Sequence, residues 1–249
     1  MNARFLVPGA YASGDVVALP DAEAQHLTRV LRLRAGDGVR VFDGRGREFA
    51  ATVTSTSKAG ASVRVGESHA PAPEPRVAIT IAHAVLKGDK MDDVVRDAVM
   101  IGAAAIQPVV TERTEVTLET LRRGRRRERW ERVAVSSAKQ CGRAVVPSIG
   151  EPLAFDALPD ALGSRRLPEP AFMLVEPGAA GPSQALSEID VTPPREAMLV
   201  IGPEGGWTTG EVDRAAAVCR LIRLGGRTLR ADAMSTVAIA ALFAVWKEF

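Results

Sequence analysis

The chain has 249 residues, of which 46% are hydrophobic, and this is enough apolar material for two modest domains or one large one. A formal net charge of +2 does not by itself suggest a polyanion as partner, and the two cysteines and three histidines lack metal-ligand spacing. The start of the chain has no signal-peptide core, and the longest apolar run, residues 233–246, is too short to span a bilayer. We therefore expect a soluble cytoplasmic protein without a metal.

The first 70 residues predict a small β-rich domain whose strand pattern suits a barrel. Helical spacing over residues 21–33 places three apolar side chains on one face: Leu27, Val30 and Leu31. Alternation of apolar and polar residues predicts strands at residues 39–46, 48–54 and 61–65. Asp43-Gly44, between the first two of these, is a turn signal for a hairpin.

A proline-rich segment at residues 70–75 predicts a stiff linker, which gives domains at 1–72 and 73–249. Beyond it strands and helices alternate. Strands are expected at residues 76–82, 105–110, 171–175, 197–201 and 222–224. Helices are expected from Asp89 or Asp92 to residue 105, at 128–141, behind each of the last three strands, and from about residue 232 to the end. This alternation is typical of an α/β fold with a parallel sheet.

Two of these strands run into glycine-rich loops. Residues 199–201 lead into residues 202–206, and Thr208 with Glu211 then forms a capping-box signature for a new helix. About twenty residues later a second strand ends in Leu224-Gly225-Gly226-Arg227. Such loops can hold a small cofactor with backbone groups, and together they predict one pocket. Neither a phosphate-binding P-loop nor a Gly-x-Gly-x-x-Gly motif after the first strand is present.

In combination, residues 201–206 and 224–230 resemble the signature of the RsmE family, SPOUT-superfamily enzymes that methylate N3 of a uridine in 16S ribosomal RNA of the small subunit. Further similarity lies at residues 26–33, 36–37, 87–92, 111–113, 140–143 and 147. The resemblance implies an enzyme that uses S-adenosyl-L-methionine (SAM) and works as a homodimer. It also implies a SPOUT α/β domain with a deep trefoil knot at about 172–235, behind a PUA-like RNA-binding β-barrel.

The resemblance also assigns the cofactor residues to three loops. They are Val175, Glu176, Gly202, Pro203, Glu204, Gly205, Gly206, Leu224, Gly225, Arg227 and Leu229. Two positions depart from the family pattern. Met100 stands where family members usually carry Glu, and Asp232 replaces the Glu of a Thr-Glu-Thr segment.

Methylation at N3 requires that a proton leave the uracil. Glu204 or Asp232 could accept that proton, and Arg230 or Arg227 could stabilise negative charge on the uracil oxygens. The catalytic candidates are therefore Arg230, Glu204 and Asp232. An equally strong structural interpretation is that Arg230 and Asp232 simply pair and cap the last helix.

Basic side chains are the candidate RNA contacts. Seven arginines lie between residues 122 and 132, where a solvated helix face is the usual alternative to a phosphate-binding surface. The candidates are Arg29, Arg32, Lys87, Lys90, Arg113, Arg125, Arg126, Arg127, Gln140 and Arg143. The apolar helix near the end must be buried, either in the core or in a dimer contact.

Three alternatives stay open beside the N3 methyltransferase. One is a ribose 2′-O methyltransferase of the same superfamily. Another is a catalytically silent RNA-binding protein. The third is a Rossmann-type methyltransferase using residues 175–181, although that loop lacks the glycine spacing.

Overall fold

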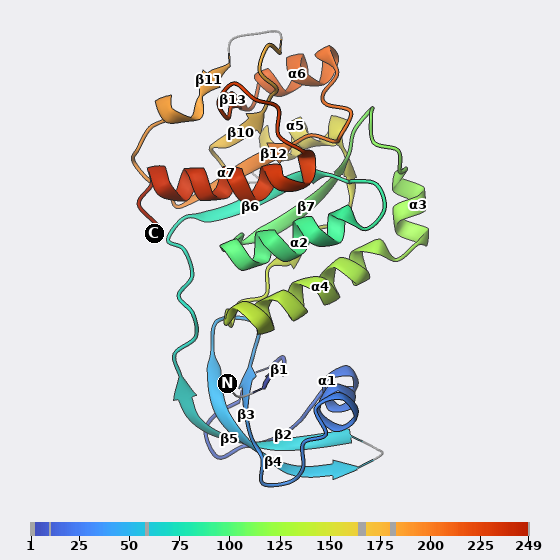
Figure 1. Ribbon diagram of the computed structural model, residues 1–249, viewed down its shortest axis with the longest axis vertical. Coiled ribbons are helices and arrows are strands. Elements are labelled where there is room, and N and C mark those ends of the chain that lie inside the picture. The colour runs from blue at the N-terminus through green and yellow to red at the C-terminus, as the bar shows by residue number, and fades with distance from the viewer. Residues whose placement is uncertain (1–2, 10, 58–59, 164–167, 180–182, 249) are drawn as a thin grey trace. The chain divides into compact units, whose positions relative to one another are not determined.

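The computed structural model describes residues 3–9, 11–57, 60–163, 168–179 and 183–248 (Figure 1). The chain forms two compact units. Unit 1 consists of residues 1–74 and 135–146, and unit 2 of residues 75–134 and 147–249. One division falls within the proline-rich linker, and another falls inside helix α4 (Arg126–Cys141). The contribution of residues 135–146 to unit 1 has no counterpart in the sequence analysis.

Unit 1 is built on a five-stranded sheet in the order β1-β3-β4-β5-β2. The strands are β1 (Arg4–Leu6), β2 (Val16–Ala18), β3 (Gly38–Phe42), β4 (Glu48–Ser57) and β5 (Gly60–His69). The predicted hairpin is confirmed, because β3 pairs antiparallel with β4 on either side of the Asp43-Gly44 turn. Alternate residues of these strands, among them Val41, Val53 and Val63, form the buried core of the unit.

The predicted helix over residues 21–33 is shorter and partly of a different type. Helix α1 (Asp21–Gln25) passes into a π-helical turn, η1 (His26–Val30). Leu27 is buried, but the side chains of Val30 and Leu31 are 68% and 40% exposed, so the predicted apolar face is wrong for these two. A π-helical turn has i→i+5 hydrogen bonds, which shifts the later side chains away from the face that a 3.6-residue period would give them.

Unit 2 contains an eight-stranded sheet in the order β11-β13-β10-β12-β6-β7-β8, with β9 beside β7. The strands are β6 (Ala78–Ala84), β7 (Ala105–Val110), β8 (Ser148–Ile149), β9 (Leu153–Ala154), β10 (Ala171–Leu174), β11 (Gln184–Ala185), β12 (Glu196–Ile201) and β13 (Arg220–Arg223). Every pairing among them is parallel, which confirms the predicted α/β sheet.

Helices cover both faces of this sheet. On one face α2 (Lys90–Ile101) and α7 (Ala231–Val245) lie side by side (Figure 1). On the other, α5 (Leu158–Gly163) and α6 (Thr209–Ala216) pack onto a core that includes Met173 and Val200. The sheet is thus buried on both sides, as parallel sheets require.

After β10, where a helix was expected, the described chain forms β11 and a 3₁₀ turn, η3 (Leu186–Glu188). Helix α7 buries Ile239 and Phe243 in the core, but the side chain of Val237 is 42% exposed. Burial of that side chain in a dimer contact stays a prediction. Within the described residues, no helix is long and apolar enough to cross a membrane.

Candidate functional site

A cavity of about 430 Å³ lies at the carboxyl ends of β10, β12 and β13. Its walls come from the three loops that follow these strands and from the starts of α2 and α7. The lining residues are Lys90, Leu174, Val175, Glu176, Pro177, Ile201, Gly202, Pro203, Glu204, Gly206, Trp207, Leu224, Arg227, Thr228, Leu229, Arg230, Ala231, Asp232 and Met234. The prediction that the two glycine loops form one pocket is therefore confirmed.

Most of the predicted site residues line this cavity. All three catalytic candidates are there, and so are the cofactor candidates except Gly205 and Gly225. Trp207 and Met234 also line the cavity, although neither is among the predicted site residues, and Lys90, which was predicted only as an RNA contact, lies there too. Of the alternative glycine loop at 175–181, residues 180 and 181 lie outside the described residues.

The first glycine loop has its shape because side chains crowd against its backbone. A Cβ atom at Gly202 would lie 2.9 Å from Cε2 of Trp207, and one at Gly206 would lie 2.8 Å from Oε1 of Glu176. Gly206 also has a φ of +68°, a conformation that L side chains rarely adopt. Any larger residue at either position would have to displace a wall of the cavity.

The loop ends in the capping box that its sequence predicts. The Thr208 hydroxyl accepts a hydrogen bond from the Glu211 backbone N–H at 3.2 Å, and the Glu211 carboxylate accepts one from the Thr208 backbone N–H at 2.9 Å. The buried Glu211 carboxylate also accepts the backbone N–H of Glu112 at 2.9 Å. The segment around residue 112 is thereby tied to the glycine loop.

Arg113 strengthens this connection. Its guanidinium donates to the carbonyl oxygen of Gly205 at 2.8 Å, and its Cβ would be 3.2 Å from a Cβ at Gly205. Gly205 therefore faces Arg113. Arg113, a candidate RNA contact, is engaged in supporting the first glycine loop.

Two ion pairs lie in the cavity wall. The Lys90 ammonium is 2.9 Å from Oε1 of Glu204, and the Arg230 guanidinium contacts Asp232 at 2.5 Å. The second pair was one of the two interpretations considered for these residues. Arg230 occupies the N-cap position of α7, but no side-chain hydrogen bond caps the helix there, so pairing is confirmed and side-chain capping is not.

These pairs keep both carboxylates ionised. Partial burial acts to raise the pKa of Glu204, but hydrogen bonding and the charge of Lys90 hold it below the usual 4.5. The hydrogen bond from Arg230 lowers the pKa of Asp232 below its usual 3.8, against a smaller opposing effect of burial. The two pairs therefore contribute two anions and two cations to the cavity wall at neutral pH.

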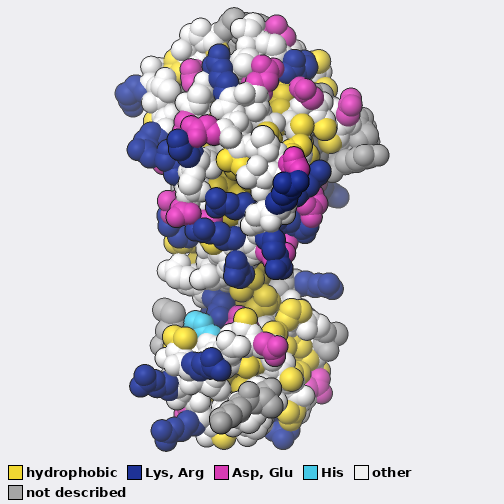
Figure 2. All heavy atoms as spheres, turned by 90° about the vertical axis from the view of Figure 1, so that its right-hand side faces the viewer, with side chains coloured by type: hydrophobic (Ala, Val, Ile, Leu, Met, Phe, Trp, Pro, Cys, Tyr) yellow, Lys and Arg dark blue, Asp and Glu magenta, His cyan; other side chains and the backbone are white. Residues whose placement is uncertain are grey.

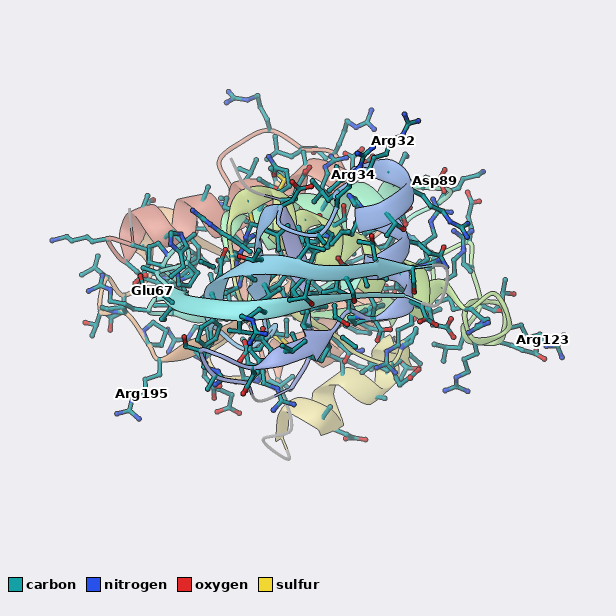
Figure 3. All side chains as sticks on the ribbon, turned by 90° about the horizontal axis from the view of Figure 1, so that it is seen from below. Arg32, Arg34, Glu67, Asp89, Arg123 and Arg195 are labelled. Atoms are coloured by element: carbon teal, nitrogen blue, oxygen red, sulfur yellow. The ribbon has the colours of Figure 1, made fainter. Side chains whose placement is uncertain are left out.

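Most of the arginines near the start of α4 are paired with acidic side chains. Arg125 contacts Glu128 at 2.5 Å, and Arg127 contacts Glu131 at 3.1 Å. Figure 2, which faces the side where α3 (Leu118–Arg123) lies, shows Lys and Arg side chains interspersed with Asp and Glu. Figure 3 shows Arg123 pointing away from the ribbon at the end of α3. Arg126 has no ion pair within the described part of the chain.

The other RNA candidates differ in exposure. Arg29, Arg32 and Gln140 are exposed. Lys87 is exposed and pairs with Glu115 at 3.0 Å. Arg143 is only 4% exposed and binds the carboxylate of Glu74, an arrangement that favours a structural role. Across the described residues, no three His, Cys, Asp or Glu side chains gather in a way that could hold a metal ion.

Comparisons with known proteins agree on one family. Residues 73–243 match the RNA methyltransferase domain, and residues 19–66 match the RNA methyltransferase PUA domain. The chain is 32% identical over 246 residues to ribosomal RNA small subunit methyltransferase E of Synechocystis sp., spanning 98% of this chain and 78% of the relative.

Solved structures show the same relationship. Ribosomal RNA small subunit methyltransferase E from Neisseria gonorrhoeae, bound to SAM, superposes with a TM-score of 0.86 at 30% identity and covers 99% of this chain and 98% of its own. A Legionella pneumophila protein in complex with the cofactor SAM gives a TM-score of 0.88 at 27% identity, with 98% of both chains covered.

Proposed function

The chain belongs to the RNA methyltransferase family that includes ribosomal RNA small subunit methyltransferase E, and we propose that it uses SAM to methylate N3 of a specific uridine in 16S ribosomal RNA. The observation that carries this proposal is the cavity, because three loops after neighbouring parallel strands meet around it. Relatives named ribosomal RNA small subunit methyltransferase E match nearly the whole chain.

The cavity suits SAM in size and in chemistry. A volume of about 430 Å³ falls in the range of small-molecule sites. Glycines at positions 202 and 206 bring bare backbone to its wall, and the carboxylates of Glu176, Glu204 and Asp232 complement a positively charged ligand. SAM bound there would supply a methyl group that is attached to a sulfonium sulfur. The uracil nitrogen would bond to the methyl carbon as the carbon–sulfur bond breaks.

Side chains of this protein have to bind the uridine and accept the proton that leaves N3. An ionised carboxylate, Glu204 or Asp232, accepts that proton and then releases it to water. Arg230 or Arg227 stabilises the negative charge that develops on the uracil oxygens. Both arginines line the cavity, and the Arg230 side chain is 74% exposed, so it is accessible to RNA.

We further propose the knotted topology of the SPOUT enzymes. Strand β13 lies on the opposite side of β10 from β12, although β12 precedes it in the chain. The segment after β13 then returns across the strand ends to α7, which packs on β12 and β6. The segment after β10 leads the other way, to β11 at the sheet edge. Two connections that cross in this manner support a trefoil knot within residues 172–235.

The remaining parts of the proposal concern RNA binding and assembly. Unit 1 would act as a PUA-like barrel that contributes RNA contacts, with 16S RNA or a small-subunit particle as partner in the cytoplasm. A homodimer would cover the apolar side chains that α2 and α7 leave open, since Met100 and Val237 are 44% and 42% exposed.

Deleting the gene tests the proposed function in the cell. The small-subunit RNA should then lack one N3-methyluridine, detected by mass mapping of its nucleosides, and the cloned gene should restore it. Loss of a ribose 2′-O-methyl group would support the alternative within the superfamily. A complete set of modifications together with no affinity for SAM would support the silent RNA-binding protein.

A further inference from the structure

Lys90 lies in the wall of the cavity, whereas a lysine that only contacted RNA phosphates would not have to lie there. Its ammonium contacts the Glu204 carboxylate at 2.9 Å, and the two side chains remain 41% and 39% exposed. The charge of Glu204 also acts on Arg230 and helps to raise the pKa of that guanidinium, after the larger effects of Asp232. Glu204 is therefore paired with one cation and lies near enough to a second to act on its pKa, and all three groups line the cavity.

Strand order brings Lys90 to this position. β6 pairs directly with β12, with Ala82 opposite Val200 and His83 opposite Ile201. The chain leaving β6 and the glycine loop leaving β12 therefore emerge beside each other. Lys90 is the first residue of α2, so its side chain starts from a fixed helix terminus.

The three groups have complementary hydrogen-bonding characters. Ammonium and guanidinium groups only donate hydrogen bonds, whereas an ionised carboxylate only accepts them. Lys90, Glu204 and Arg230 can thus offer the order donor, acceptor, donor. The Watson–Crick edge of uracil has the matching order of acceptor, donor, acceptor at O4, N3–H and O2.

We propose that Lys90, Glu204 and Arg230 bind the Watson–Crick edge of the target uracil and that Lys90 is a specificity-determining residue. This inference rests on the proposed function and deepens it. The carboxylate faces N3–H, the Lys90 ammonium faces O4 and the Arg230 guanidinium faces O2. Cytosine would set its unprotonated N3 against the carboxylate and its amino group against Lys90, so two of the three contacts would become repulsive.

The test compares two RNAs that differ only at the methylated position, once nucleoside mapping has located it. One RNA carries uridine there and the other cytidine, and both are titrated onto enzyme holding S-adenosylhomocysteine. Lys90→Met should weaken binding of the uridine RNA about tenfold. Binding of the cytidine RNA should stay unchanged or become tighter, because the ammonium that opposes the cytosine amino group is gone. Lys90→Arg should keep much of the preference, because guanidinium is also a donor.

Arg195→Met is the matched control, because it removes the same charge from a side chain that points away from the ribbon (Figure 3). It should alter neither RNA affinity nor selectivity. Equal weakening of both RNAs by Lys90→Met would show a phosphate contact and overturn the inference. Unchanged binding of the uridine RNA would overturn it too. Calorimetry with SAM separates this failure from failure of the proposed function: in the latter case the wild-type protein itself would neither bind SAM nor methylate uridine.

Discussion

The indole of Trp207 lies directly against the backbone of Gly202, so that a Cβ at Gly202 would be 2.9 Å from Cε2 of the ring. The indole cannot move away freely. Its Nε1–H donates to the carbonyl oxygen of Leu174 at 2.8 Å, and its ring packs on Phe155 with centroids 5.1 Å apart. Trp207 therefore sets the spacing between the loops that follow β10 and β12, which are two of the three loops around the cavity.

Substituting Gly202 by Ala should lower the affinity for SAM by at least about tenfold, because the new methyl group must displace the ring that shapes the cavity. Isothermal titration calorimetry measures this directly. Gly210→Ala is the control, because Gly210 lies in α6 and does not line the cavity. The nearest atom to a Cβ there would be Nη1 at the far end of the flexible Arg214 side chain, 3.4 Å away. Equal affinities for the two variants would contradict the assigned role of the glycine loop.

Local patterns could predict the loops, the capping box and the parallel strands, because each depends on residues that are near in the sequence. Gly202 and Trp207 are only a few residues apart, but their contact depends on the conformation of the turn between them. The alternation of residue types does not predict that conformation. The pairing of Lys90 with Glu204 depends on β6 lying beside β12, which no local pattern determines. The π-helical turn at residues 26–30 was missed because the expected period is that of an α-helix.

Loss of the Lys90 ammonium should raise the pKa of Glu204. In the wild-type protein this pKa lies below 4.5, so the pairing stabilises the fold at pH values above 4.5. That stabilisation is lost as the pH falls through the lowered pKa of Glu204, because the carboxylate is then protonated. In Lys90→Met burial still acts to raise the pKa while the hydrogen bond is gone, so the carboxyl should protonate at higher pH. Carbon NMR titration of the Glu204 carboxyl group measures the shift. An unchanged titration curve would show that the pair does not form in solution.

Replacing Arg125, Arg126 and Arg127 together by Ala should weaken RNA binding and flatten its dependence on salt. Arg125 and Arg127 already lie against carboxylates, so the slope of log K against log salt should change by nearer one unit than three. The readout is RNA affinity across a series of salt concentrations. A slope identical to that of the wild type would show that these arginines form only a solvated helix face.

Arg4 should be essential to the stability of unit 1. Its buried guanidinium pairs with Glu48 at 2.8 Å and donates to the carbonyl oxygens of Ala138 and Arg143 in the second segment of that unit. Arg4→Met would leave Glu48 buried beside a cation no closer than Arg40 at 3.8 Å, and should cost on the order of 3–5 kcal/mol.

Denaturant unfolding measures this loss. Arg64→Met is the control, because its hydrogen bond to the Gly14 carbonyl oxygen is exposed and the expected change is within about 0.5 kcal/mol. A loss for Arg4→Met as small as that of the control would contradict the structural role of the buried pair.

The most direct test of the account is methylation by the purified protein. Small-subunit RNA or particles from cells lacking the gene would be incubated with labelled SAM, and the modified nucleoside would be identified by mass spectrometry. N3-methyluridine is expected at a single position, lost in Gly202→Ala and retained in Gly210→Ala. Label on a ribose 2′-oxygen, or a protein that neither binds SAM nor transfers label to either substrate, would contradict the account.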